Sequence, residues 1–484
     1  MKQFSLYLCL FIACACSKPN NPTPPVDNST PKAETDSITA VKFSSALFGG
    51  NILSQGADSV TERGFCYSTL PGPTIASEKL LAGKGTGVFS AMLTGLTPNS
   101  TYYVRAFGTS SKGTGYGKEL SFKTAELDSA KLIFIGGANA LYCFNAKDGS
   151  MKWAKTVGAW VTSSPCYANG LVYVGCEDSY LYAFDTTGVL KWSANTGRPI
   201  ERFSPVVSNG VVFINNDKFA IAYNAVTGAE KWKFDVNTYP TSITGIYTGL
   251  TLANNTIYLN CNVIYALYAE TGAVKWTSGT TYYNVYMKPK VVNNKLYTFY
   301  YNNWDFMSLD ASNGNLIWKK HLYSASGNGI SVNVYDKYVY FYNEGLTVMD
   351  TLNGDIKWTC GGGNSSKSHQ AGSSPVITDG FVHLLSGGGV LVREALTGAF
   401  NYQEYGRAGD VAILEGDVTV VNGFSYYGTR DVFNSYNGYL RATGISENGQ
   451  LNSTGWRSTV KSDFRTTPCV VTASGKMYRA GDVY

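Results

Sequence analysis

The stretch LYAFDTTGVLKW, residues 181–192, holds the pattern that decides the fold. A run of alternating apolar residues ends at a Thr-Gly turn around Gly188, and Trp192 stands four residues after the glycine. This pattern predicts a strand, a tight turn that needs a positive φ at the glycine, and a second strand that carries the tryptophan. The turn glycine recurs along the chain as Gly149, Gly188, Gly228, Gly272, Gly314, Gly354, Gly398 and Gly449.

The spacing of these glycines predicts a β-propeller. Successive glycines lie 39, 40, 44, 42, 40, 44 and 51 residues apart. A period of about 40 residues with strand content is typical of one four-stranded blade per repeat. We therefore predict an all-β chain with an eight-bladed propeller over residues 130–484. Seven blades are the alternative, because the last copy is irregular.

Tryptophans follow the turn glycines at a fixed place. The first six copies carry one four residues after the glycine, as Trp153, Trp192, Trp232, Trp276, Trp318 and Trp358. Tyr402 and Ser453 hold this place in the last two copies, although Trp456 lies close by. A large flat ring at the same position in each outer strand can fill the space between neighbouring blades. We interpret the six tryptophans as structural docking residues.

Two copies carry a recognisable family motif. AYNAVTGAEKW at 222–232 and ALYAETGAVKW at 266–276 resemble the Ala-x-Asp-x-x-Thr-Gly-x-x-x-Trp docking motif of PQQ-type propeller repeats. In these two copies Asn224 and Tyr268 replace the motif Asp. Asp310 and Asp350 keep it in the two copies that follow. In repeat type the chain is similar to the propeller lipoprotein of the outer-membrane barrel-assembly machinery.

The family resemblance implies the propeller fold but not the redox chemistry of the family's quinone-dependent enzymes. Quinone-dependent enzymes with such repeats carry adjacent cysteines beneath the cofactor, together with an Asp base and calcium ligands. This sequence has no Cys-Cys pair, and a fold alone does not confer an activity. His321, His369 and His383 show no metal-ligand spacing. We predict that the chain is not an enzyme and has no cofactor and no metal; a quinone-dependent dehydrogenase is the distant alternative.

The two ends of the propeller region predict how the ring closes. The first copy lacks the innermost strand that later copies carry as SSPCYANG or FSPVVSNG. The segment TTPCVVTASGKMY at 466–478 can supply it, which would leave no exposed sheet edge. Cys166 and Cys469 occupy matching places in two copies, so a disulfide between them and buried free thiols both stay open, with free thiols preferred.

The N-terminus resembles that of a bacterial lipoprotein. MKQFSLYLCLFIACAC has one lysine, an apolar core and small residues, which predicts a signal peptide over 1–15. Ala13 and Ala15 precede Cys16, the expected lipidation site, and a polar linker follows over 16–35. We expect a membrane attachment through this lipid anchor. An ordinary cleaved signal, or lipidation at Cys14, is the alternative.

Residues 36–125 predict a small β-sandwich. Short alternating strands are separated by Gly, Pro and Asn turns. Leu96, Pro98 and Tyr102 in LTGLTPNSTYYVRAFG resemble the tyrosine corner of fibronectin type III domains. The resemblance implies that the Tyr102 hydroxyl bonds back to the backbone near the preceding turn.

The loops between blades hold the candidate binding residues. Such loops converge on one mouth of a propeller channel, and in this chain they mix aromatic, Arg and amide side chains, which suits a peptide or a sugar chain. A solvated rim without a ligand is the alternative. The candidates are Trp160, Arg198, Arg202, Tyr239, Tyr283 and Arg407.

Two kinds of function follow. The first is an outer membrane-anchored lipoprotein, facing the periplasm or the cell surface, whose propeller binds or scaffolds a protein or peptide partner. The second is a cell-surface lipoprotein that binds glycans. The net charge of +5 is small and dispersed over 484 residues, so nucleic acid is not an expected partner.

Overall fold

The computed structural model describes most of the chain after residue 27, and its contacts divide the chain into two compact units. Unit 1 is Met1–Leu127 and unit 2 is Asp128–Tyr484. Within the residues described, no helix is long and apolar enough to cross a membrane. The described residues are 28–42, 44–126, 130–238, 245–246, 248–261, 263–278, 287–300, 305–322, 332–342, 345–361, 374–378, 380–386, 389–403, 418–421, 424–428, 438–445, 451–462, 464, 466–474, 476–479 and 482–483.

Unit 1 is a sandwich of two antiparallel sheets. The first sheet has the order β1 (Lys32–Thr39), β2 (Ala46–Ser54) and β5 (Gly87–Leu93). The second has the order β4 (Glu78–Leu81), β3 (Glu62–Ser68), β6 (Thr101–Ser110) and β7 (Gly113–Tyr116), and β8 (Leu120–Lys123) also pairs with β6.

The core of unit 1 is aromatic and aliphatic. Phe48 of the first sheet meets Phe65 of the second edge to face, with ring centroids 5.4 Å apart, which is a favourable arrangement for two rings. The hydroxyl of the buried Tyr102 accepts a hydrogen bond from the backbone N–H of Thr97 at 3.0 Å. This is the contact that the tyrosine-corner resemblance implies.

The described strands of unit 2 form eight antiparallel sheets, each of at least four strands. We call them the first to eighth sheets in chain order, and we name the strands of each sheet in their order of pairing. The first is β11 (Met151–Thr156), β10 (Ala140–Asn145), β9 (Ala130–Gly137), β40 (Cys469–Thr472), β41 (Met477–Arg479) and β42 (Asp482–Val483). The second is β12 (Cys166–Ala168), β13 (Leu171–Gly175), β14 (Tyr180–Asp185) and β15 (Leu190–Asn195). The third is β16 (Val206–Ser208), β17 (Val211–Asn215), β18 (Phe219–Asn224) and β19 (Glu230–Asp235), followed by the 3-10 helix η1 (Val236–Thr238).

The remaining sheets repeat this plan. The fourth is β20 (Thr251–Ala253), β21 (Thr256–Asn260), β22 (Ile264–Tyr268) and β23 (Val274–Thr277). The fifth is β24 (Lys290–Val292), β25 (Lys295–Tyr300), β26 (Asp305–Asp310) and β27 (Leu316–His321). The sixth is β28 (Val332–Tyr335), β29 (Tyr338–Tyr342), β30 (Gly345–Asp350) and β31 (Ile356–Gly361). The seventh is β32 (Val376–Thr378), β33 (Phe381–Ser386), β34 (Gly389–Glu394) and β35 (Phe400–Gln403). The eighth is β36 (Thr419–Val421), β37 (Phe424–Gly428), β38 (Gly438–Ile445) and β39 (Leu451–Ser462).

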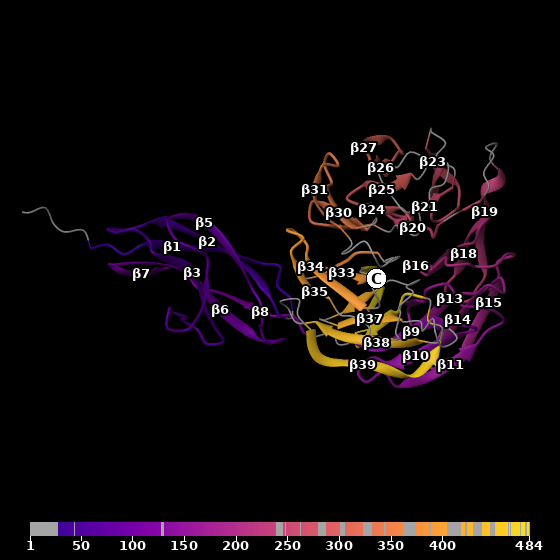
Figure 1. The fold of residues 1–484 in the computed structure, drawn as a ribbon, viewed down its shortest axis with the longest axis horizontal. Coiled ribbons are helices and arrows are strands. Elements are labelled where there is room, and N and C mark those ends of the chain that lie inside the picture. The colour runs from indigo at the N-terminus through magenta and orange to yellow at the C-terminus, as the bar shows by residue number, and fades with distance from the viewer. Residues whose placement is uncertain are drawn as a thin grey trace, which may run out of the picture. The chain divides into compact units, whose positions relative to one another are not determined.

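Unit 2 has a propeller architecture. In Figure 1 its sheets surround a common centre, with strands such as β16 and β20 inside and β15, β19 and β31 outside. No α-helix occurs among the described residues, and the prediction of an all-β chain is confirmed.

The ring closes because β40, near the end of unit 2, pairs with β9, at its beginning. β40 pairs antiparallel with β9, with Cys469 opposite Phe134 and Val470 opposite Ile133. The prediction that residues 466–478 complete the first blade is thereby confirmed. The pairing hides an edge that would otherwise expose unpaired N–H and C=O groups.

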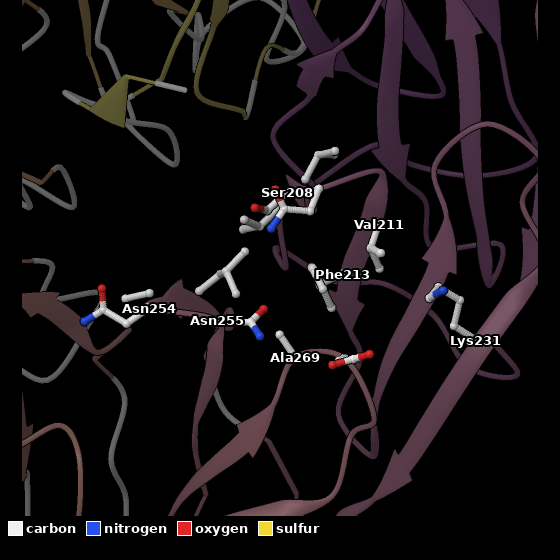
Figure 2. A pocket seen from close by; sticks show the side chains of 13 residues that line it. Ser208, Val211, Phe213, Lys231, Asn254, Asn255 and Ala269 are labelled. Carbon is white, nitrogen blue, oxygen red and sulfur yellow. The ribbon is translucent and has the colours of Figure 1, made fainter.

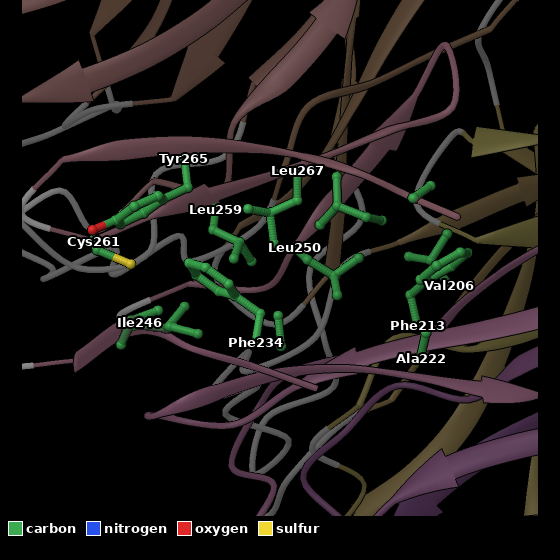
Figure 3. Close-up of a cluster of buried hydrophobic side chains, with 14 of the residues drawn as sticks. Val206, Phe213, Ala222, Phe234, Ile246, Leu250, Leu259, Cys261, Tyr265 and Leu267 are labelled. Carbon is green, nitrogen blue, oxygen red and sulfur yellow. The ribbon is translucent and has the colours of Figure 1, made fainter. Parts of the chain in front are cut away.

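Buried apolar clusters join neighbouring sheets. Figure 3 shows the cluster between the third and fourth sheets, which includes Phe213, Leu250 and Tyr265. Another cluster, with Phe144 and Leu440, joins the first sheet to the eighth. Burying one such side chain contributes about 1.5–3 kcal/mol, so contacts between neighbouring sheets stabilise the ring.

Each docking tryptophan reaches the next sheet. Its indole Nε1–H donates to a backbone carbonyl just before the next turn glycine, while its ring lies against that glycine. The donor and acceptor pairs are Trp153 to Thr186 (2.9 Å), Trp192 to Ala225 (3.0 Å), Trp232 to Ala269 (2.9 Å), Trp276 to Ala311 (3.0 Å), Trp318 to Thr351 (3.1 Å) and Trp358 to Leu396 (3.0 Å).

Trp456 makes the corresponding contact for the eighth sheet. Its Nε1–H donates to the carbonyl of Ala146 in the first sheet at 3.0 Å, and its ring covers Gly149. The sequence pattern fails at Ser453 because the tryptophan of this copy stands seven residues after Gly449 instead of four. β39 is also longer than the outer strands before it, and it carries the indole to the place that the other copies reach directly.

The turn glycines are required for two physical reasons. Gly272 has a φ of +72°, and a Cβ there would come within 2.7 Å of the Trp232 ring. Gly170, in the turn between β12 and β13, has a φ of +83°, but nothing lies within 4 Å of the place of its Cβ. Substitutions at Gly170 and Gly272 can therefore distinguish the effect of backbone strain from the effect of packing against the indole.

We expect Gly170→Ala to destabilise the protein by about 1–2 kcal/mol through the left-handed backbone alone. Gly272→Ala should cost a further ~1–3 kcal/mol, because the methyl group displaces the Trp232 ring. Urea unfolding of both variants measures the difference. Equal losses of stability would contradict the role assigned to the indole contact.

Several outer turns open on an Asp or Asn that caps the turn. Asp310 Oδ1 accepts hydrogen bonds from Ser312 Oγ at 2.6 Å and Ser312 N at 2.8 Å. These two bonds hold the pKa of Asp310 below its ordinary value, and the bond from the Ser312 side chain has the larger effect. Asn224 makes the same kind of cap, because its Oδ1 accepts from the N–H groups of Val226 and Thr227.

Asp310→Asn should therefore weaken the response of the protein to acid. A carboxyl with a lowered folded-state pKa stabilises the fold above its unfolded pKa of about 4 and loses that contribution as the pH falls through the folded pKa. Asparagine keeps an acceptor oxygen but does not titrate. Melting temperatures followed from neutral to acidic pH should fall less steeply in Asp310→Asn, and Asn224→Asp should show the reverse. Parallel curves for all three proteins would be the contrary result.

Candidate binding surface at the channel mouth

Three of the six predicted mouth residues lie in described loops. Trp160 stands between β11 and β12 and is 43% exposed. Arg198 and Arg202 stand between β15 and β16. Tyr239, Tyr283 and Arg407 lie outside the described residues.

A buried valine fixes the loop of Trp160. Val161 is 1% exposed and packs against Gly136 of β9, where a Cβ would collide with its side chain. The N–H of Val161 donates to the carbonyl of Ala138 at 2.7 Å. The indole next to it is thus presented to solvent from a rigid support.

The loop of Arg198 and Arg202 is fixed in the same way. Ile200 is fully buried, and a Cβ on Gly175 of β13 would come within 2.5 Å of its Cγ2. The N–H of Ile200 donates to the carbonyl of Cys176 at 3.1 Å. Both arginines therefore flank an apolar anchor that holds their loop against the second sheet.

Hydrogen bonds through Thr162 bring the two loops together. Its Oγ1 accepts from the N–H of Arg202 at 3.3 Å and donates to Glu177 Oε1 at 3.1 Å. The N–H of Glu177 in turn donates to the carbonyl of Trp160 at 3.0 Å. Arg202 has a φ of +58°, a conformation that costs a residue with a Cβ free energy. Trp160 and Arg202 thus belong to one connected surface, which we call the mouth surface.

Arg198 has a structural partner. Its Nε and Nη2 each lie 2.5 Å from an oxygen of Asp217, in the loop after β17. The side-chain hydrogen bond to Asp217 raises the pKa of Arg198. Because this ion pair is exposed, it adds little stability, but it orients the loop. The structure thus gives Arg198 a positioning role that the sequence did not indicate.

Sequence reasoning missed the acidic residues of this surface. Asp178 Oδ2 accepts hydrogen bonds from the Tyr182 hydroxyl at 2.6 Å and from the N–H of Gly158 at 2.9 Å. Burial, and after it this contact with Asp178, raises the pKa of Tyr182. The pair Glu177–Asp178 directly after an apolar strand was the available signal.

The strand β41 lies beside the mouth surface. Arg479 of β41 is 5% exposed, and its Nη1 donates to the carbonyls of Pro205 at 3.1 Å and Pro165 at 3.2 Å. Pro165 and Pro205 directly precede the inner strands β12 and β16. The chain therefore uses a buried guanidinium to tie its own end to the second and third sheets.

The described part of the chain shows no group of three or more His, Cys, Asp or Glu side chains that could hold a metal ion. Cys166 and Cys469 are buried free thiols, and burial raises the pKa of each. Where the sequence left a disulfide or free thiols open, the structure has free thiols. His369 lies outside the described residues.

Comparison with known proteins places the repeats in a family. A family model described as outer membrane protein assembly factor BamB matches residues 115–236, 197–328 and 262–472. A relative of that name from Moranella endobia is 26% identical over 289 residues, which cover 54% of this chain and 71% of the relative. The relative of the same name from Burkholderia pseudomallei is 24% identical over 229 residues, covering 44% of this chain and 58% of the relative.

One solved structure shares the fold at low sequence identity. The crystal structure of the computationally designed Ika8 protein has a TM-score of 0.51 at 13% identity, covering 68% of this chain and 94% of that one. The crystal structure of BamB from Moraxella catarrhalis has a TM-score of 0.49 at 17% identity, covering 67% of this chain and 91% of that one. The relatives are named as assembly factors and not as enzymes, which confirms the prediction of a non-enzymatic chain.

Proposed function

Because the chain belongs to the family of the outer membrane protein assembly factor BamB, we propose that it is a non-enzymatic scaffold of outer membrane protein assembly. Its propeller holds a protein partner from that machinery through the mouth surface. The curated relatives carry the name of an assembly factor, which favours a protein partner over the glycan ligand that the sequence left open.

The observation that carries this proposal is the presentation of Trp160. Trp160 is 43% exposed, yet Val161 beside it packs tightly against Gly136 of the first sheet. An aromatic side chain held rigidly at the surface, with Arg202 and Glu177 close by, has the character of an interface anchor. The docking tryptophans lie between sheets, where each ring packs against the turn glycine of the next sheet.

We also propose the finer architecture and the location. The eight sheets and the Trp456–Ala146 contact support an eight-bladed ring. The Tyr102–Thr97 contact supports a fibronectin type III-like sandwich. The family description refers to the outer membrane, and we propose that the chain lies at the periplasmic face of that membrane, with Cys16 as its lipidated residue and residues 16–35 as a spacer.

Trp160→Ala should weaken the association with assembly proteins while the fold stays intact. Loss of an interface anchor typically costs about 2 kcal/mol or more in binding, whereas truncation of an exposed side chain changes stability little. The measurement is affinity purification of the tagged chain from detergent-solubilised membranes, with co-purifying outer membrane assembly proteins quantified by mass spectrometry.

Two variants serve as controls for this test. Trp232→Ala should lower the melting temperature, at a cost of about 3–5 kcal/mol for a large buried ring. Arg202→Ala should behave like Trp160→Ala. If both mouth variants co-purify as much partner as the unmodified chain, the mouth surface is not the binding site.

Cys16→Ser should release the chain from membranes. Acyl chains on a single cysteine anchor a protein domain only when the thiol is present. Fractionation of cells that produce either form, followed by immunoblotting, measures the outcome. A Cys16→Ser form that stays in the membrane fraction would argue against this anchor.

A further inference from the structure

A second surface lies at the other end of the third and fourth sheets. β16 runs from the mouth loop at Pro205 to a turn at Ser208–Asn209, so the turn is the end away from the mouth. There a groove of about 540 Å³ opens between the third and fourth sheets. Figure 2 shows Ser208 and Phe213 on one side of the space and Asn254 and Asn255 on the other. We call it the interblade groove.

The floor of the groove is apolar and belongs to the core. Phe213 and Ala269 are both buried and form part of the cluster that joins the two sheets. Val211 and Leu252 are partly buried, pack against the same cluster and also line the groove. An apolar floor on a packed core keeps its shape when it is empty, and this is typical of a ligand pocket.

The inner end of the groove is lined by asparagine amides. Asn209, Asn254 and Asn255 have φ values of +49°, +48° and +55° and form the tight turns of β16–β17 and β20–β21. Within the described residues their side chains make no hydrogen bond. Asn224, which caps an outer turn, instead uses its side chain on its own backbone.

The outer end of the groove carries one charge of each sign. Lys231 lies on β19, and Glu270 lies in the turn after β22. In the part of the chain that the structure describes, neither side chain forms an ion pair or hydrogen bond. Among the first seven copies of the outer turn, only this one has an acidic residue two places before the glycine.

The chemistry of these walls selects among ligand classes. An amide side chain both donates and accepts hydrogen bonds, as a peptide group does. The Glu270 carboxylate disfavours a phosphate or another anion. Phe213 is only 3% exposed, so the groove offers no ring on which a sugar could stack. An extended peptide with an aliphatic side chain satisfies both the apolar floor and the amides.

We propose that the interblade groove binds a short extended peptide segment whose aliphatic side chain sits on the partly buried Val211 and Leu252 and whose backbone bonds to Asn254 and Asn255. This goes beyond the proposed function, because the mouth surface lies at the opposite end of the inner strands. One scaffold then offers two separate sites to polypeptide chains.

The test uses a fluorescein-labelled peptide, Gly-Thr-Leu-Thr-Leu-Thr-Gly, and a control peptide with serine in place of both leucines. Binding to the purified chain is followed by fluorescence polarisation. A photoreactive leucine in the first peptide, read out by mass spectrometry, should label residues 206–213 or 251–255. The leucine peptide should bind at least about tenfold more tightly than the serine peptide.

Three variants make the test specific. Asn254→Gly with Asn255→Gly keeps the left-handed turn and removes both amides, and Ala253→Trp fills the groove from its half-buried position. Each should weaken binding by about tenfold. Asn293→Gly makes the same exchange in the β24–β25 turn, where φ is +50° and which does not line this groove, and it should leave binding unchanged.

Contrary outcomes are distinct. Absence of saturable binding, equal binding of the serine peptide, or labelling elsewhere would overturn the proposal. Binding that only Trp160→Ala abolishes would move the peptide to the mouth surface and leave the proposed function standing. Self-association of the chain that Ala253→Trp abolishes would assign the groove to a second copy instead.

Discussion

The contact of an indole with the turn glycine of the next sheet is the interaction on which the propeller depends. Ala225 shows how closely the sheets are joined: its carbonyl accepts from Trp192 Nε1 at 3.0 Å and from the Tyr173 hydroxyl at 3.0 Å. Both lone pairs of one buried oxygen are thus used. Burial also raises the pKa of Tyr173 to about 12, so the hydroxyl stays a donor at any physiological pH. Each sheet therefore depends on its neighbour for polar groups as well as apolar area.

Glycines also fix the mouth loops, which lie at the opposite end of the blades from the outer turns. Gly136 and Gly175 have room for the side chains of Val161 and Ile200, and Gly428 meets Phe464 in the same way. These contacts involve β9, β13 and β37, which pair with the inner strands β40, β12 and β36, whereas the indole contacts involve outer turns. The loops can therefore change their exposed residues, such as Trp160, without disturbing the contacts that hold the ring together.

Much of the fold could be predicted because the repeat is carried by residues whose roles are local. A positive φ requires the glycine, and a fixed spacing places the tryptophan, so both are visible in the sequence. Trp456 was not assigned because its distance from Gly449 differs, and only tertiary contact reveals its partner. The ion pair of Arg198 with Asp217 and the hydrogen bonds of Thr162 join residues that are far apart in the chain. No local sequence pattern therefore predicts these contacts.

The link between the fourth and fifth sheets shows how one residue can break the plan without breaking the fold. Asn215 Nδ2 donates to the carbonyl of Thr248, and its Oδ1 accepts from the N–H of Leu250. Asn260 holds the matching place and donates to the carbonyl of Met287, but two residues later stands Pro289, which has no N–H. Asn260 Oδ1 is accordingly buried without a hydrogen bond in the described structure. Since an orphaned buried acceptor costs about 1–3 kcal/mol, the ring must carry enough stability from its other interfaces to tolerate one imperfect link. That reserve follows from closure, because every sheet is held from two sides.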